Sequence, residues 1–366
     1  MIKVFLIDDS ALVRAFLEEV LAEDNEIEVV GKTVDAYFAM NKIKTLKPDI
    51  ILLDIQMPKM DGIEFLKKLM HEYPTPVIMF SSLTQDGSEM TIKALELGAI
   101  DYIAKPQENL TDNLAKVKKL IISKIKSLTN KHVKEIISKR PELIMKDTDI
   151  IKKTTARKTA MKPNIKPKPP GLVKKTDSII LIGASTGGTR AVTEILKVMP
   201  ENSPPIVVVQ HMPALFTSKF AENVDRVSAI KVSEAKDKDI LETGKAFIAP
   251  GGKHTLIKRD RRGYYLNVVE GPPVNHHKPS VDVLFRSAAK TLKHKAIGVI
   301  LTGMGSDGAV GMAEMKIAGA YNIAQNKDTC VVFGMPKEAI SRKATNIVLP
   351  LDDIPIHILQ KIGYID

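Results

Sequence analysis

The chain has 366 residues, a formal net charge of +11 and one cysteine, Cys330. This length suits about two domains, and a single cysteine excludes an intramolecular disulfide, which favours a cytoplasmic protein. No apolar run approaches the ~18 residues that a membrane-spanning helix needs, and the N-terminus lacks an export signal, so we expect no membrane insertion.

Four short apolar runs in the first third of the chain predict buried β-strands. Amphipathic stretches, such as the one from Leu12 to Leu21, separate them and predict helices. Alternation of strands and helices is typical of a parallel, doubly wound α/β sheet. The predicted strands are Lys3–Ile7, Ile50–Leu53, Val77–Phe80 and Tyr102–Ala104.

Polar residues follow these strands: Asp8 and Asp9, then Asp54, Ser81 and Lys105. The carboxyl ends of parallel strands meet at one edge of the sheet, so these side chains are expected to converge. Carboxylates this close need a counter-cation, and their hard oxygen atoms suit Mg²⁺. A carboxylate beside Mg²⁺ and a lysine can attack a phosphoryl group. The alternative is that the aspartates are ordinary turn and helix-capping residues.

Residues 1–127 resemble the receiver domain of two-component response regulators, a flavodoxin-like fold with a five-stranded parallel sheet. The resemblance rests on the aspartate pair, the block from Leu53 to Gly62, Ser81, Tyr102 and Lys105–Pro106. It implies phosphorylation of Asp54 by a chemotaxis histidine kinase and Mg²⁺ binding by Asp8, Asp9 and Asp54. It also implies that Ser81 and Tyr102 are switch residues and that Lys105 contacts the phosphate.

Residues 128–175 are expected to form a basic linker. Between Lys131 and Lys175 there are 14 Lys and Arg against 4 Asp and Glu, and no aromatic residue. Such a segment buries too little apolar surface to fold, and its Lys-Pro alternation favours an extended spacer. A solvated linker is the main interpretation, and an anion-binding arm is the alternative.

The segment from Ser178 to Gly188 places Ser185 between an apolar run and the start of a predicted helix at Thr189–Met199. A serine on such a turn lies beside helix N-terminal amides that could stabilise an oxyanion. The segment also fits the G-x-S-x-G nucleophile pattern. The alternative is a glycine loop that cradles a phosphate, with Ser185 as a helix cap.

Polar residues again follow predicted strands in residues 176–366. His211 and Asp307, together with Ser185, could meet at one edge of a second doubly wound sheet as an acyl-transfer triad. His276 and His277 remain an alternative base or metal pair, and Asp307 could instead cap a helix. The predicted strands are Ile179–Ile182, Ile206–Gln210, Ala246–Ala249, Ile297–Leu301, Asn322–Ala324 and Ile347–Leu349.

The order Ser, His, Asp along the chain disfavours an α/β-hydrolase, in which the order is Ser, Asp, His. Residues 176–366 resemble the catalytic domain of chemotaxis protein-glutamate methylesterases. The matching blocks are Ile182–Gly188, Val209–Met212, Ile248–Gly252 with His254, Gly271–Val274 with Pro279–Asp282, Leu301–Gly305 with Asp307–Gly308, and Cys330–Pro336.

This second resemblance implies that Ser185, His211 and Asp307 are the triad and that the backbone N–H of Met304 contributes to the oxyanion hole. It implies hydrolysis of glutamate γ-methyl esters on methyl-accepting chemotaxis receptors with release of methanol, and probable deamidation of receptor glutamines. No cofactor is expected in the esterase site, and Cys330 is expected to be structural.

Two other functions compete with a phosphorylation-gated receptor esterase. One is a serine hydrolase of small esters. The other is a DNA-binding response regulator, although no helix-turn-helix pattern follows Asp177 and the positive charge lies in the predicted linker, so no nucleic acid partner is expected. We expect the receiver to cover the esterase site until Asp54 is phosphorylated.

Overall fold

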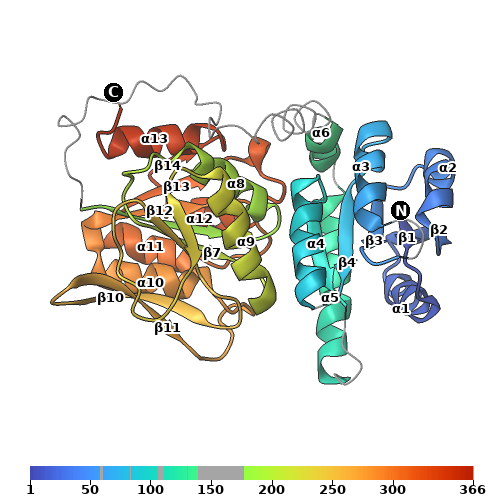
Figure 1. Ribbon diagram of the computed structural model, residues 1–366, viewed down its shortest axis with the longest axis horizontal. Coiled ribbons are helices and arrows are strands. Elements are labelled where there is room, and N and C mark those ends of the chain that lie inside the picture. The colour runs from blue at the N-terminus through green and yellow to red at the C-terminus, as the bar shows by residue number, and fades with distance from the viewer. Residues whose placement is uncertain (58–60, 83, 106–110, 130, 139–176, 366) are drawn as a thin grey trace. The chain divides into compact units, whose positions relative to one another are not determined.

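The computed structural model describes residues 1–57, 61–82, 84–105, 111–129, 131–138 and 177–365 (Figure 1). The chain divides into two units, Met1–Arg157 and Lys158–Asp366, each with its own parallel sheet.

The sheet of the first unit has five parallel strands in the order β2-β1-β3-β4-β5, which confirms the predicted doubly wound fold (Figure 1). Helix α1 packs against α5, and α3 packs between α2 and α4. The elements are β1 (Ile2–Ile7), α1 (Ala11–Ala22), β2 (Ile27–Thr33), α2 (Ala36–Leu46), β3 (Ile50–Asp54), α3 (Gly62–Glu72), β4 (Val77–Ser81), α4 (Gln85–Glu96), β5 (Asp101–Ala104) and α5 (Thr111–Leu128).

The sequence signals that start these helices are polar caps. Ser10 accepts a hydrogen bond from the Val13 N–H at the start of α1, and Asp61 accepts one from the Ile63 N–H at the start of α3. Each cap satisfies an amide that has no partner within its helix. Strands β3 and β4 are buried along their whole length, as their continuous apolar sequences predict.

A further helix, α6 (Lys131–Ser138), occupies the start of the segment predicted to be a solvated linker. Its Val133 and Ile137 are buried, and Lys134 forms an ion pair with Asp49, which precedes β3. The linker prediction is therefore wrong for residues 131–138, because a few apolar residues at helical spacing outweigh the high charge. Residues 139–176 lie outside the described part of the chain.

The second unit contains a seven-stranded parallel sheet in the order β14-β13-β12-β6-β7-β9-β8 and a separate antiparallel hairpin, β10–β11. The strands are β6 (Ile179–Ala184), β7 (Ile206–Gln210), β8 (Lys231–Glu234), β9 (Lys245–Ile248), β10 (His254–Asp260), β11 (Gly263–Val269), β12 (Ala296–Ile300), β13 (Tyr321–Gln325) and β14 (Ile347–Leu349).

Helices cover both faces of this sheet, so it is also doubly wound (Figure 1). Helix α10 packs on α11 and on the hairpin strand β10, whereas α8 packs with α9 and α13. The helices are α8 (Gly188–Val198), α9 (Ala214–Val227), α10 (Val281–Thr291), α11 (Ala309–Ile317), α12 (Met335–Ser341) and α13 (Asp353–Lys361), with short 3₁₀ turns at Lys293–Lys295 and Lys327–Thr329.

The apolar core of the second unit gathers around α10 and α11. Phe285 and Met312 are fully buried there, and all six residues of β6 are buried at the centre of the sheet. The strand order changes direction at β6, since β7 lies on one side of it and β12 on the other. Loops that follow β6 and β12 therefore diverge at the carboxyl ends of these strands, the position at which open α/β sheets typically have a ligand-binding crevice.

None of the helices in the described part of the chain is both long enough and apolar enough to span a membrane.

Candidate functional site

Three polar residues follow the central strands of the second unit. Ser185 comes directly after β6 and His211 directly after β7, while Asp307 lies in the loop between β12 and α11. Because β7, β6 and β12 are neighbours in that order, their carboxyl ends adjoin at the crevice. The fold thus brings the three predicted triad residues to one edge of the sheet.

Backbone hydrogen bonds hold Ser185 in place. Its N–H donates to the Thr302 carbonyl at 3.0 Å, and its own carbonyl accepts from Gln210 Nε2 at 2.9 Å and from the Gly188 N–H at 2.7 Å. The N-cap of α8 is Gly187, in the left-handed region at φ 75°, and not Ser185. The capping alternative for Ser185 is therefore wrong, and its hydroxyl is not used to start the helix.

His211 is fixed by Asp307. The His211 Nε2 atom lies 2.8 Å from Asp307 Oδ2, and the His211 N–H donates to the Ala184 carbonyl at 3.1 Å. In this arrangement Nε2 carries the proton and donates it to the carboxylate. The other ring nitrogen, Nδ1, is buried and has no hydrogen-bond partner among the described residues, so it is available as a proton acceptor.

The Asp307 carboxylate lies at the N-terminus of α10. It accepts hydrogen bonds from the N–H groups of Val281 (2.7 Å) and Asp282 (3.2 Å), and from Ser280 Oγ (2.8 Å). Burial acts to raise the pKa of Asp307, but its bonds to His211, Asn275 and Ser280 outweigh burial and hold this pKa well below its usual range. Asp307 therefore stays ionised while it orients the imidazole.

Asp307 does not cap the helix that follows it. The N-cap of α11 is Gly308, with φ 92° and no side-chain capping bond. Asp282 instead accepts a 2.6 Å bond from the Gly311 N–H in the first turn of α11. Burial raises the pKa of Asp282, and the nearby negative charge of Asp307 raises this pKa further. The hydrogen bonds from Gly311 and Asn275 oppose the rise without cancelling it.

The loop that contains Met304 runs against Ser185. A Cβ atom on Gly303 would come within 2.7 Å of the Ser185 Cβ, so only glycine allows this approach. The Gly303 carbonyl accepts from the N–H groups of Gly334 (3.1 Å) and Met335 (2.9 Å). In a trans peptide the N–H of the next residue points the opposite way, so the Met304 N–H is directed away from α12.

The sequence pattern did not single out three residues that surround the triad: Asn275, Ser280 and Asp282. Ser280 and Asp282 lie inside a block that carried the resemblance, and that block was the available signal. Of the alternative histidine pair, His277 stacks on the His211 ring, whereas His276 is exposed. Cys330 is fully buried, and burial raises the pKa of its thiol, so it is a core residue and not a nucleophile.

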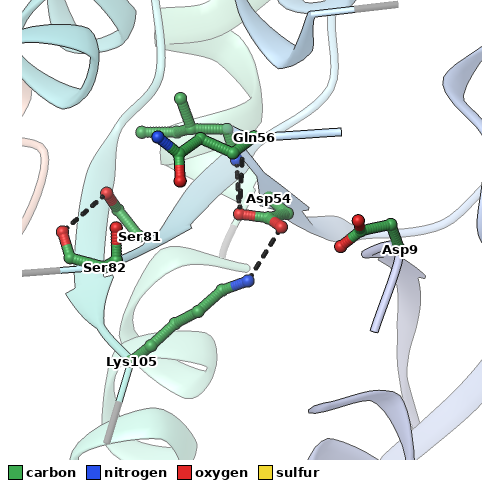
Figure 2. A pocket seen from close by; sticks show the side chains of 7 residues that line it. Asp9, Asp54, Gln56, Ser81, Ser82 and Lys105 are labelled. Atoms are coloured by element: carbon green, nitrogen blue, oxygen red, sulfur yellow. Dashed lines mark hydrogen bonds and ion pairs between the residues drawn. The ribbon is translucent and has the colours of Figure 1, made fainter. Parts of the chain in front are cut away.

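The first unit contains a second polar cluster at its own switch point, between β1 and β3. Carboxylate oxygens of Asp8, Asp9 and Asp54 lie within 4.8 Å of one another. Lys105 Nζ lies 2.8 Å from Asp8 Oδ2 and 2.8 Å from Asp54 Oδ2. Figure 2 shows the lysine reaching Asp54 from one side while the Asp9 carboxylate points towards Asp54 from another. The structure thus brings these four predicted residues together.

The charges in this cluster are unbalanced. Burial raises the pKa of Asp54, the Lys105 ammonium opposes this rise, and the Asp8 carboxylate adds to it. Burial alone would lower the pKa of Lys105, but its bonds to Asp54 and Asp8 outweigh burial and raise it. One ammonium faces three carboxylates, so the donor set fits a divalent cation, with hard oxygen ligands and excess negative charge.

A pocket of about 310 Å³ opens beside Asp54 and is lined by Asp9, Asp54, Ile55, Gln56, Ser81, Ser82 and Lys105 (Figure 2). Ser81 Oγ lies 3.3 Å from the carbonyl oxygens of Ser82 and Gly87. Tyr102 is buried on β5 and does not line this pocket, and its burial raises the pKa of the phenol well above the usual value. Of the two predicted switch residues, Ser81 therefore lines the pocket beside Asp54, the phosphoacceptor candidate, and Tyr102 does not.

Comparisons with known proteins cover both units. The profile of the CheB methylesterase family matches residues 180–358, and that of the response regulator receiver domain matches residues 4–116. The chain is 44% identical over 362 residues to protein-glutamate methylesterase/protein-glutamine glutaminase 3 of Geobacter metallireducens, covering 99% of each chain. It is 45% identical over 358 residues to the protein-glutamate methylesterase/protein-glutamine glutaminase of Sulfurimonas denitrificans, and this match covers 98% of this chain and 97% of that one.

Among solved structures, the Thermotoga maritima CheB methylesterase catalytic domain is 41% identical to this chain. The match covers 50% of this chain and 98% of that one, with a TM-score of 0.49.

Proposed function

Because the chain belongs to the family of receiver-linked CheB methylesterases and is a protein-glutamate methylesterase/protein-glutamine glutaminase, we propose that Ser185, His211 and Asp307 carry out its reaction. The observation that carries this proposal is the 2.8 Å bond from His211 Nε2 to Asp307, which leaves the buried Nδ1 atom without a partner among the described residues. This geometry supplies an oriented general base, and the His211 backbone N–H bonds to the carbonyl of Ala184, the residue before Ser185.

In the proposed reaction, His211 Nδ1 accepts the proton of Ser185 Oγ as the oxygen attacks the γ-carbonyl carbon of a glutamate methyl ester. The tetrahedral oxyanion is stabilised by backbone N–H groups, of which Met304 is the candidate. When the intermediate collapses, the bond from carbon to the methoxy oxygen breaks, the imidazolium gives its proton to that oxygen so that methanol leaves, and an acyl-serine remains. Water, activated by His211, then releases glutamate and restores the serine.

The same residues account for deamidation of receptor glutamines. The glutamine amide carbon is attacked in the same way, and ammonia leaves in place of methanol, so both substrates give one acyl-serine. Throughout both reactions the ionised Asp307 faces the imidazolium and stabilises its charge. We propose no cofactor for this site, since a serine, a base and an orienting carboxylate complete the chemistry.

The receiver domain implies phosphorylation-dependent regulation, and we propose that Asp54 is the phosphoacceptor. Asp8, Asp9 and Asp54 would hold Mg²⁺, which neutralises charge on the incoming phosphoryl group when bound. Lys105, already in contact with Asp54, would contact the phosphate. Ser81, on the pocket wall, and Tyr102 are the proposed switch residues.

The proposed partners are a chemotaxis histidine kinase as phosphodonor and methyl-accepting chemotaxis receptors as substrate, and the proposed location is the cytoplasm. We propose that residues 176–366 form the esterase and that the receiver extends past the limit of residue 127 predicted from the sequence, to residue 138. Helix α6, at residues 131–138, is added to the receiver because Lys134 pairs with Asp49. The remaining connection is then a tether, and the unphosphorylated receiver restrains the esterase.

The test is incubation of the full-length protein with radiomethylated receptor fragments, measuring volatile methanol with and without a small acyl-phosphate donor and Mg²⁺. Methanol release that rises with the donor supports the proposal. Cleavage of small esters at the same efficiency as receptor, with no response to the donor, would instead indicate an unregulated esterase of small substrates.

A further inference from the structure

A tight turn at Val274–His277 lies against the triad. The Val274 N–H donates to the His277 carbonyl at 3.0 Å, and the His277 N–H donates to the Val274 carbonyl at 2.9 Å. The two central residues, Asn275 and His276, are left-handed at φ 52° and 67°. These values are typical of the two-residue hairpin turn that asparagine favours at its first central position. The turn therefore has a defined shape, from which two side chains extend to the catalytic residues.

The first of these side chains is His277. Its ring lies parallel to the His211 ring, with centroids 3.7 Å apart and an angle of 9° between the planes. The hydrogen bond from His211 Nε2 to Asp307 holds the imidazole at one edge only. It does not stop the plane of the ring from tilting about the axis of that hydrogen bond. A flat ring packed on its face opposes that rotation, so the contact fixes the direction in which Nδ1 points.

The second side chain is Asn275. Its Nδ2 group donates to Asp307 Oδ1 at 2.8 Å and to Asp282 Oδ2 at 2.7 Å, so both N–H bonds are used. The amide thus links two buried carboxylates and holds Asp307 on the side opposite the bond to His211. Asp307 Oδ2 remains for His211 and the Val281 N–H.

We propose that His277 and Asn275 are positioning residues, through which this one turn sets the orientation of both His211 and Asp307. The proposal rests on the proposed triad. His277 acts by the flat face of its ring, which stacks on His211, and Asn275 acts by its amide and not by its left-handed backbone. Because both residues act through His211 and Asp307 in this proposal, their loss is expected to lower kcat and leave KM nearly unchanged.

The experiment compares substitutions in phosphorylated full-length protein with radiomethylated receptor fragments. His277→Ala is expected to lower kcat about 10-fold with KM within about 2-fold, whereas His277→Phe, which keeps a flat ring, stays within about 3-fold of wild type. Asn275→Gly keeps the turn geometry but removes the amide, and we expect a similar loss of about 10-fold in kcat. His276→Gly is the matched control, since it relaxes the same turn at an exposed residue, and should leave kcat unchanged.

A second measurement does not depend on ester hydrolysis. In protein labelled with ¹⁵N-histidine, we expect the His211 Nε2–H, hydrogen-bonded to Asp307, to give a slowly exchanging proton resonance that disappears in His211→Gln. We expect this resonance to persist in His277→Phe and to be lost to exchange in His277→Ala.

These outcomes separate the two proposals. If wild-type protein releases no methanol, or if Ser185→Ala retains full activity, the proposed function fails while the resonance still tests the positioning role. If His277→Phe loses as much activity as His277→Ala, or if both retain the resonance and full kcat, the positioning role of His277 is overturned. Full activity of Asn275→Gly overturns that of Asn275.

Discussion

His211 Nε2 lies 2.8 Å from Asp307 Oδ2, so the nitrogen that faces the carboxylate is the one farther from the histidine backbone. In the common serine-protease arrangement Nδ1 faces the aspartate and Nε2 faces the serine. Here the ring is used the other way round, and Nδ1 becomes the proposed base. The roles of the residues are unchanged, because a triad is defined by which groups face one another and not by atom names.

Replacing Ser185 by alanine is expected to lower methanol release from methylated receptor at least ~10³-fold, because no acyl-enzyme can form. Ser185 and Asp54 lie in different units of the chain, so the variant should still incorporate phosphate at Asp54. The measurement is methanol release beside phosphate incorporation on the same preparation. Methanol release at the wild-type rate would show that Ser185 is not the nucleophile.

Substituting Asp307 by asparagine should lower kcat about 10³–10⁴-fold, because the amide no longer favours the tautomer with the proton on Nε2. It should also destabilise the esterase unit at neutral pH by about 1–3 kcal/mol, since buried donors such as the Val281 N–H lose a charged acceptor. Denaturant unfolding and steady-state kinetics measure the two effects. Equal kcat in both proteins would exclude an orienting role for this carboxylate.

The pH dependence of this stability follows from the depressed pKa of Asp307. A carboxyl whose pKa is lower in the folded than in the unfolded protein contributes its full stabilisation above about pH 4 and loses it as the pH falls through the folded value. The difference in unfolding free energy between wild type and Asp307→Asn should therefore be constant from pH 7 to about 5 and shrink below about pH 4. A difference that grows on acidification would contradict the assigned direction.

Mg²⁺ should bind the receiver through the acidic cluster. The substitution Asp9→Asn removes one of three carboxylates within 4.8 Å of one another, and we expect at least about tenfold weaker Mg²⁺ binding, measured by calorimetry. Asp86→Asn, an exposed carboxylate in the first turn of α4, is the matched control. If both variants bind Mg²⁺ as tightly as wild type does, the cation site lies elsewhere.

A fragment beginning near residue 171 should hydrolyse receptor esters without any phosphodonor, because the esterase unit has its own core and carries all three residues of the proposed triad. The full-length protein should be slow until donor and Mg²⁺ are added, and Asp54→Asn should stay slow. A tenfold change needs only about 1.4 kcal/mol of coupling between the domains. A fragment no faster than the unphosphorylated full-length protein would mean that phosphorylation acts by recruitment to the receptor.

The strands that the sequence pattern did not predict share one property. Strands β2 and β8 lie at sheet edges, and β10 and β11 form a two-stranded hairpin outside the larger sheet, so polar residues such as Glu28 and Lys258 interrupt their apolar patterns. Strands β3, β4, β6 and β7, whose residues are all buried, were predicted almost to the residue. A continuous apolar run indicates a strand that is buried on both faces, and this signal weakens where a strand meets solvent.

The sequence by itself determined which residues stand at the ends of strands. Asp8, Asp54, Ser185 and His211 each end or directly follow an apolar run, and a parallel sheet brings such positions to one edge. Tertiary structure alone decided how these residues face one another. The bond between His211 and Asp307 spans 96 positions, and Asn275 and His277 reach the triad only because the chain before α10 turns back onto the crevice. Local patterns carry no information on such contacts, since these depend on packing between elements far apart in the chain.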